Sequence, residues 1–226
     1  MKFSLPVFVL SLFSSFLFAE EAKKAPEKWE PDIARFEARD LESPPVKDAW
    51  LFVGSSSIRK WDLTSSWPDQ ETINNGFGGS TLADSIHFFD RLFLPYQPEV
   101  ILIYAGDNDI NRGLTAKEVA KDFETLAASI SASFPGVPIV FLAIKPSEKR
   151  WELWPKMRHA NELVAEKCAL KENWFFADTA TPMLEGSESA PDSSWFVEDG
   201  LHLSDEGYSE WTQIVNMTLR EAGIIP

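Results

Sequence analysis

The chain has 226 residues, of which 44% are hydrophobic, and it carries a formal net charge of −14 at pH 7. This length and apolar content suit one α/β domain with a full hydrophobic core. The acidic balance and the lack of a basic face argue against nucleic acid as a partner and against binding to anionic membranes. Cys168 is the only cysteine, so no internal disulfide can form, and its helical context predicts a buried packing role.

The N-terminal segment 1–19 differs from the rest of the chain. Lys2 gives the segment a positively charged N-terminus, an uncharged apolar run covers residues 3–18, and Ala19 precedes two glutamates. This pattern predicts a secretory signal peptide and export to the periplasm or the extracellular space, with no stable membrane insertion after processing. An uncleaved anchor is the alternative, because Leu17 is large for its place in the cleavage site.

Residues 20–47 are charged and contain prolines, which predicts a tether with at most a short helix near Ile33–Phe36. The remaining residues, 48–226, alternate between short apolar runs and amphipathic segments without an internal repeat. This alternation predicts a three-layer α/β/α fold with a five-stranded parallel sheet in the flavodoxin-like order. The expected strands are 48–53, 72–74, 100–104, 139–144 and 174–177, and the expected helices begin near 80–81, 115, 154 and 204.

Three serines, Ser55, Ser56 and Ser57, follow the first expected strand. The carboxyl ends of parallel strands are where open α/β sheets bind ligands, so these hydroxyls are expected to face a crevice. A serine attacks an ester only when a base removes its proton. The simpler alternative is a serine-rich turn that caps the next helix.

His202 is the candidate base. It precedes the last expected helix and follows Asp199 by three residues, a spacing that lets the carboxylate accept the Nδ1 proton and leaves Nε2 for a serine. His87 and His159 lie within helical patterns and are expected at the surface or in grooves. The alternative is that Asp199 is a turn residue and His202 a packing residue.

Two further loops can stabilise an oxyanion. Residues 76–80 (Gly-Phe-Gly-Gly-Ser) can offer backbone N–H groups at a helix N-terminus, and Asn108 can offer its side-chain amide after the central strand. The alternatives are a tight turn that requires glycine and a turn rich in Asp and Asn.

Taken together, these four segments resemble the SGNH (GDSL-type) hydrolase family, from about Phe52 to Tyr208. The resemblance implies a flavodoxin-like α/β/α fold and ester hydrolysis with no metal and no cofactor. It also implies the site residues: Ser56 as nucleophile, His202 as base, Asp199 as its orienting acid, and an oxyanion hole from the Ser56 and Gly79 N–H groups and the Asn108 side chain.

One position departs from the family pattern. Where the family has Gly-Asp-Ser, this chain has Gly54, Ser55 and Ser56, so the aspartate is missing. That aspartate is not a triad member, and we expect activity without it. The ordinary α/β-hydrolase pattern fits less well, because its nucleophile elbow needs glycine at position 58, which is Ile58.

The sequence thus predicts an exported serine esterase that hydrolyses acetyl or short acyl esters through an acyl-enzyme. Tryptophans in segments 150–155 and 194–196 can stack on sugars or simply pack, which favours a carbohydrate ester over a lipid or a thioester. The sequence carries no signal for an oligomeric state. A non-catalytic ligand-binding module on the same fold is one alternative. The other is a metal-dependent phosphoesterase using Asp107, Asp109, Asp199 and His202.

Overall fold

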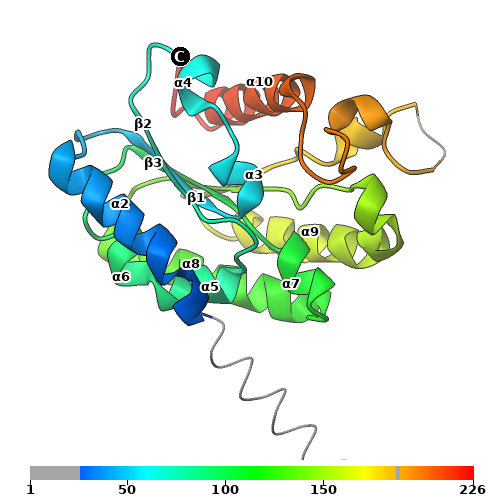
Figure 1. Cartoon of the computed structure of the whole chain (residues 1–226), viewed down its shortest axis with the longest axis horizontal. Helices are drawn as coiled ribbons and strands as arrows, with labels where there is room; N and C mark the ends of the chain where they lie inside the picture. Colours follow the sequence, from blue (N-terminus) through cyan, green and yellow to red (C-terminus); the bar gives the residue numbers. More distant parts are fainter. Residues whose placement is uncertain (1–25, 187–188) are drawn as a thin grey trace, which may run out of the picture.

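The computed structural model describes residues 26–186 and 189–226, so the predicted signal peptide at 1–19 lies outside the described residues. A five-stranded parallel sheet lies between two layers of helices (Figure 1). Helices α2, α5, α6, α8 and α9 cover one face, and α3, α4 and α10 cover the other. None of the helices described has the length and apolar character needed to cross a membrane.

The strand order is β2-β1-β3-β4-β5, which confirms the predicted flavodoxin-like sheet. Each strand lies close to its predicted range: β1 Trp50–Gly54, β2 Thr72–Gly76, β3 Val100–Tyr104, β4 Ile139–Leu142 and β5 Trp174–Ala177. In register, Gly54 at the end of β1 pairs with Gly76 of β2 and Tyr104 of β3. The loops that follow these three strands therefore leave the sheet side by side.

The helices begin where the capping signals place them. Thr81, Thr115 and Ser204 each accept a hydrogen bond from a backbone N–H of the first helical turn. The α-helices are α2 Glu30–Glu42, α3 Ser56–Arg59, α4 Leu63–Ser66, α5 Leu82–His87, α6 Phe89–Leu92, α7 Asp107–Asn111, α8 Ala116–Ser133, α9 Trp154–Ala169 and α10 Asp205–Glu221. Short 3₁₀ helices are η1 Pro26–Trp29, η2 Glu148–Leu153, η3 Thr181–Leu184 and η4 Ser193–Trp195.

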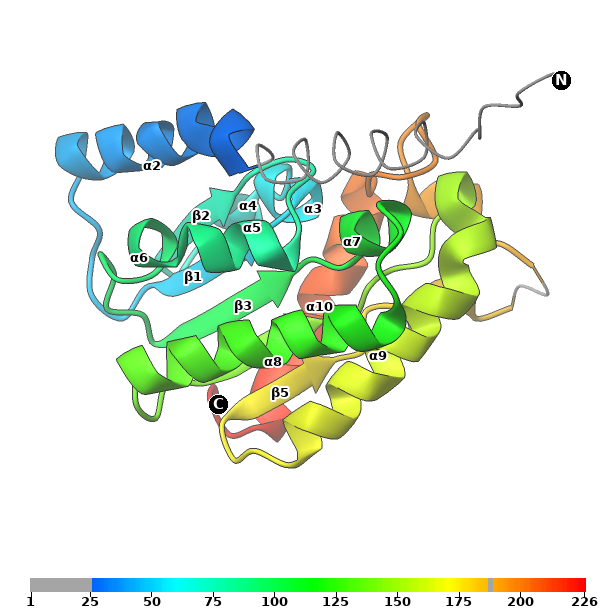
Figure 2. The ribbon, with the colours of Figure 1, turned by 90° about the horizontal axis from the view of Figure 1, so that it is seen from below.

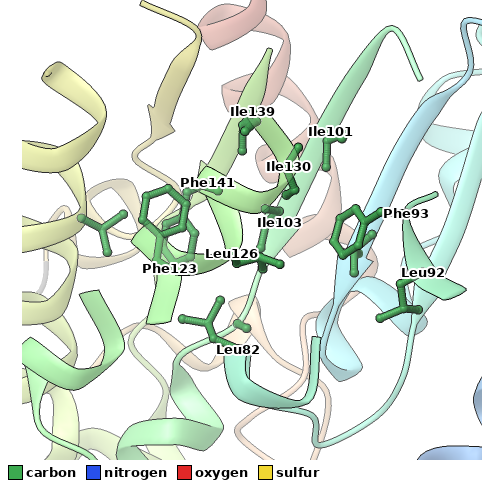
Figure 3. Packing of buried hydrophobic residues seen from close by; sticks show 14 of the residues in the cluster. Leu82, Leu92, Phe93, Ile101, Ile103, Phe123, Leu126, Ile130, Ile139 and Phe141 are labelled. Carbon is green, nitrogen blue, oxygen red and sulfur yellow. The ribbon is translucent and has the colours of Figure 1, made fainter. Parts of the chain in front are cut away.

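The central strand β3 is apolar along its length because both of its faces are covered. Its side chains alternate between the two helical layers, so Ile101 and Ile103 enter one core while Leu102 enters the other. Figure 3 shows Ile103 beside Leu126 of α8 and Ile101 beside Ile130 of the same helix, all in the first core. Cys168 is buried in the same core with a free thiol, in agreement with the predicted packing role.

Helix α2 differs from the sequence expectation of a tether with at most a short helix. It spans 13 residues and buries Ile33 and Phe36 against the sheet layer. Arg39 donates hydrogen bonds to the Asn74 carbonyl and to the Asn75 side chain of β2. Only two apolar side chains hold this charged helix to the core, which is why its composition resembled that of a linker.

Candidate active site

The candidate nucleophile lies where β1 turns into α3, at the carboxyl end of the sheet (Figure 2). Gly54 has a φ of +149°, and a Cβ there would lie 2.0 Å from the Tyr104 carbonyl oxygen, so only glycine fits this turn. Ser55 and Ser57 are buried, whereas Ser56 is half-buried. Ser56 is therefore the one of the three serines whose hydroxyl a substrate can reach.

Ser56, His202 and Asp199 form a continuous hydrogen-bonded chain. Ser56 Oγ lies 2.9 Å from His202 Nε2, and His202 Nδ1 lies 2.5 Å from Asp199 Oδ2. A carboxylate can only accept, so Nδ1 carries the proton and Nε2 is left to accept the serine proton. Such contacts are the ones that a serine nucleophile, its base and an orienting acid need for acyl transfer.

The loop before α10 holds the acid and base in place. Asp199 Oδ1 accepts hydrogen bonds from the backbone N–H groups of Leu201 (2.9 Å) and His202 (2.8 Å). Partial burial alone would raise the pKa of Asp199, but the hydrogen bonds from His202 and the backbone outweigh it and hold the pKa well below its usual range. Asp199 is therefore ionised at neutral pH, the state in which a carboxylate can accept the Nδ1 proton of a histidine.

The two candidate oxyanion loops contact each other. Asn108 Nδ2 donates to the Ser80 carbonyl at 3.0 Å, which joins the loop after β3 to the loop after β2. Arg112 donates to the Gly79 carbonyl at 2.7 Å, and Gly79 itself has a φ of +80°. Asn108 has two N–H bonds, and the one bonded to Ser80 leaves the second available to an oxyanion.

A buried charged cluster lies next to these loops, and sequence reasoning missed it. Arg150 Nη1 lies 3.0 Å from Asp107 Oδ2, and Lys145 Nζ lies 3.9 Å from the same oxygen. Lys145 also donates to the Tyr104 hydroxyl at 3.1 Å. Burial lowers the pKa of Lys145, whereas Asp107 acts in the opposite direction. A lysine that follows the apolar run of β4 was the available signal, and segment 150–155 was considered only for its tryptophans.

The residues named for a metal-dependent reaction do not gather around a common point. Asp107 pairs with Arg150, Asp199 contacts His202, and Asp109 accepts from the backbone N–H of Leu82. Within residues 26–186 and 189–226, no group of three or more His, Cys, Asp or Glu side chains is placed to hold a metal ion.

A groove of about 740 Å³ opens beside His202. Trp61 and Tyr208, whose rings stack at 5.4 Å, contribute to its wall. The other lining residues are mostly polar, namely Lys60, Asp62, Ser65, Ser66, Val197, Leu203, Asp205, Ser209, Thr212 and Gln213. The groove aromatics come from neither of the segments in which the sequence suggested sugar stacking.

The aromatic side chains of segments 150–155 and 194–196 mainly pack against other side chains. Trp151 and Trp154 stack on each other with ring centroids 6.5 Å apart, and both are half-buried. Phe196 is buried in the core below α10, and Trp195 packs against it. His87 and His159 are exposed, as their helical patterns predicted.

A parallel α/β fold with a Ser-His-Asp chain of contacts at the carboxyl ends of its strands is an arrangement that serine ester hydrolysis can use. Residues 54–209 match the model of the GDSL-like lipase/acylhydrolase family, and the chain belongs to that family. It is accordingly a carboxylic ester hydrolase of the GDSL type, which confirms the resemblance found in the sequence.

Several known proteins are similar to it. An arylesterase of Vibrio mimicus is 23% identical over 168 residues, which cover 72% of this chain and 74% of the relative. A GDSL-like lipase structure from Bacteroides thetaiotaomicron has a TM-score of 0.70 at 19% identity, covering 84% of this chain and 98% of the other. The acetylxylan esterase Axe2 of Geobacillus stearothermophilus has a TM-score of 0.62 at 16% identity, covering 79% and 95%. At these identities the two structures establish the fold alone.

Proposed function

We propose that this protein is an exported serine esterase that cleaves acetyl or short acyl esters with a Ser56-His202-Asp199 triad. The observation that carries the proposal is the chain of contacts from Ser56 Oγ to His202 Nε2, at 2.9 Å, and from His202 Nδ1 to Asp199 Oδ2, at 2.5 Å. These distances are those over which a general base takes a proton from its nucleophile. The half-buried position of Ser56 supports the same assignment.

The reaction proceeds through an acyl-enzyme. Ser56 Oγ attacks the ester carbonyl carbon while its proton passes to His202 Nε2. The resulting oxyanion accepts hydrogen bonds from the N–H groups of Ser56 and Gly79 and from the free N–H of Asn108. The C–O bond of the ester then breaks, and His202 returns the proton to the leaving alcohol. Water repeats these steps on the acyl-enzyme and releases the carboxylic acid.

An acylated carbohydrate is the proposed substrate class. The groove beside His202 is large enough for a sugar and offers hydroxyl, amide and charged groups next to an aromatic pair. The similarity of fold to an acetylxylan esterase is consistent with this choice. We place the alcohol portion of the ester in the groove, because His202, which must protonate the leaving alcohol, contributes to its lining.

Export is proposed from the sequence of residues 1–19. Mass spectrometry of the protein recovered from its native host is expected to find a mature N-terminus near Glu20. Recovery of the intact chain from the cytoplasm would contradict export without touching the catalytic assignment.

Two measurements test the chemistry. A fluorophosphonate is expected to label the protein, and peptide mapping is expected to place the label on Ser56. Ser56→Ala is expected to lower kcat by about 10⁴-fold or more. A label on Ser55 or Ser57 with Ser56→Ala still active would refute the choice of nucleophile, and loss of activity on chelation would favour the metal-dependent alternative.

A panel of aryl esters with increasing acyl length, together with acetylated xylan, tests the substrate. Activity is expected to be highest on acetyl and short acyl esters, and acetate is expected to be released from the xylan. Preference for long acyl chains, with no acetate released, would overturn the carbohydrate assignment while leaving the esterase intact.

A further inference from the structure

The Asn108 side chain can serve an oxyanion only in one of its two orientations. Its carboxamide is planar, and turning it over exchanges an N–H donor for a carbonyl acceptor of nearly the same shape. The wrong orientation would direct a partial negative charge at the negative charge that develops on the substrate. Some contact must therefore select the orientation that presents N–H.

Two hydrogen bonds make this selection. Asn108 Nδ2 donates to the Ser80 carbonyl at 3.0 Å, and Asn108 Oδ1 accepts from Arg150 Nη2 at 3.1 Å. Turning the amide over would set carbonyl against carbonyl and N–H against N–H. Asn108 is only 8% exposed, so solvent cannot readily replace these lost bonds.

Arg150 is itself held rigidly. Its Nη1 donates to Asp107 Oδ2 at 3.0 Å, so one guanidinium contacts two consecutive residues of α7 with its two terminal nitrogens. Its side chain is 15% exposed and that of Asp107 is 5% exposed. Lys145, which lies 3.9 Å from the same carboxylate, adds a second positive charge to this buried cluster.

The backbone around Arg150 also connects the two halves of the site. Arg150 has non-helical φ and ψ angles (−123°, 26°) within η2, which interrupts that 3₁₀ helix at this residue. The preceding residue, Lys149, donates its backbone N–H to the Gly200 carbonyl at 3.0 Å. Gly200 lies between Asp199 and His202, so η2 contacts both the acid-base loop and the asparagine of the oxyanion loop.

We propose that Arg150 is a positioning residue that holds the Asn108 amide with its N–H directed at the oxyanion. This role rests on the proposed function, because it requires Asn108 to act as a donor. Arg150 acts through Asn108 and does not bind the substrate. Its effect therefore belongs to the transition state, where the oxyanion forms, and not to substrate binding.

A double-mutant cycle on the full chain tests the proposal, with an aryl acetate as substrate. Asn108→Ala is expected to lower kcat by about 10²- to 10³-fold, as other single oxyanion donors do. Arg150→Ala is expected to lower kcat by roughly 10- to 100-fold with KM changed less than about threefold, because the amide is free to turn over. In the Asn108→Ala background, Arg150→Ala is expected to cost less than about threefold.

Arg158→Ala is the matched control. Arg158 is an arginine of α9 whose side chain is 65% exposed and whose ion pair with Glu162, at 3.7 Å, lies at the surface. It is expected to leave kcat and KM unchanged. Thermal unfolding of every variant separates loss of activity from loss of structure, and if Arg150→Ala does not fold, Arg150→Lys carries the test. Lysine keeps the charge beside Asp107 but cannot make both contacts, so kcat is again expected to fall at constant KM.

The remaining outcomes overturn the proposal. Additive losses in the double variant would mean that Arg150 acts independently of Asn108. A raised KM with unchanged kcat would mean that Arg150 binds substrate. If Asn108→Ala keeps the wild-type kcat while Ser56→Ala is inactive, the triad stands, but both the oxyanion assignment and the role of Arg150 fail. If Ser56→Ala is active, the proposed function itself fails.

Discussion

Replacement of Asp199 by asparagine probes the site most sharply, because it changes a charge with almost no change in shape. Two backbone N–H groups, those of Leu201 and His202, hold Oδ1 at 2.9 and 2.8 Å, while Oδ2 faces the His202 ring. In the Asp199→Asn variant the carbonyl oxygen can satisfy either the two backbone donors or the single ring donor. Facing the backbone keeps two hydrogen bonds, and facing the ring keeps one.

The difference is about 1 kcal/mol in net hydrogen bonding, and setting an NH₂ group against two backbone donors adds to it. The amide nitrogen is therefore expected to face the ring and donate to Nδ1, which moves the imidazole proton to Nε2. In that tautomer the ring donates to Ser56 and cannot take its proton. An analogous substitution in a serine protease lowers kcat by about 10⁴-fold, and we expect a loss of that order here. The retained backbone bonds predict little change in stability.

The assay is hydrolysis of an aryl acetate, with ¹⁵N NMR of the histidines to identify the tautomer and thermal unfolding to verify the fold. Asp192→Asn is the control, because Asp192 also accepts a backbone hydrogen bond, from Ser194 at 2.8 Å, without contacting the histidine. It is expected to keep activity within about twofold. Activity of Asp199→Asn within tenfold of wild type, or a large loss with the proton still on Nδ1, would refute the reasoning.

Three other substitutions have expected outcomes. Burial raises the pKa of Asp109 to about 7. The folded state therefore holds a proton that the unfolded state releases near pH 4, so the free energy of unfolding falls as the pH rises from about 4 to about 7. Asp109→Asn is expected to flatten Tm between pH 4 and 7 relative to wild type, and an identical pH dependence would contradict this. The Trp29 ring lies 3.3 Å from the position that a Cβ on Gly79 would occupy. Trp29→Ala is therefore expected to loosen the loop that carries Gly79 and to lower kcat about tenfold, and an unchanged kcat would show that the ring does not support this loop. Ser55 has a buried hydroxyl without a hydrogen-bond partner among the described residues. Ser55→Ala is therefore expected to keep activity and to leave Tm unchanged or higher, and a lower Tm would mean that the hydroxyl stabilises the turn.

Local patterns in the sequence were sufficient for most of the fold. Alternating apolar and amphipathic segments predicted all five strands, and the capping residues at 81, 115 and 204 marked the helix starts. The helix that was expected to begin near residues 80–81 ends at His87, and α6 follows it as a second helix, because Phe88 leaves helical geometry (φ −94°, ψ 19°) and is buried in the core. Such a break depends on what the helix packs against, which a periodic pattern does not contain.

For the candidate site, too, the sequence pointed to the residue types, and the structure supplied their contacts and burial. Short motifs at strand ends and helix starts pointed to three adjacent serines, the loop 76–80, Asn108 and the pair Asp199 and His202, and the family resemblance then implied Ser56 and Gly79. The structure adds that Ser56 Oγ and His202 Nε2, 146 residues apart in the chain, lie within hydrogen-bonding distance. The burial of the neighbouring serines, which leaves Ser56 accessible, also follows from packing rather than from the motif.

The sequence by itself determined the kind of fold, the family and the candidate reacting groups, because these depend on residue type and on spacing within short segments. Only the tertiary structure decided that α2 packs on the sheet and that Arg150 holds the Asn108 amide. Arg150 and Asn108 are 42 residues apart and lie in different elements, so no local pattern relates them. Their contact exists because the parallel sheet brings the carboxyl ends of β3 and β4 to one edge, where a buried amide and a half-buried guanidinium satisfy each other.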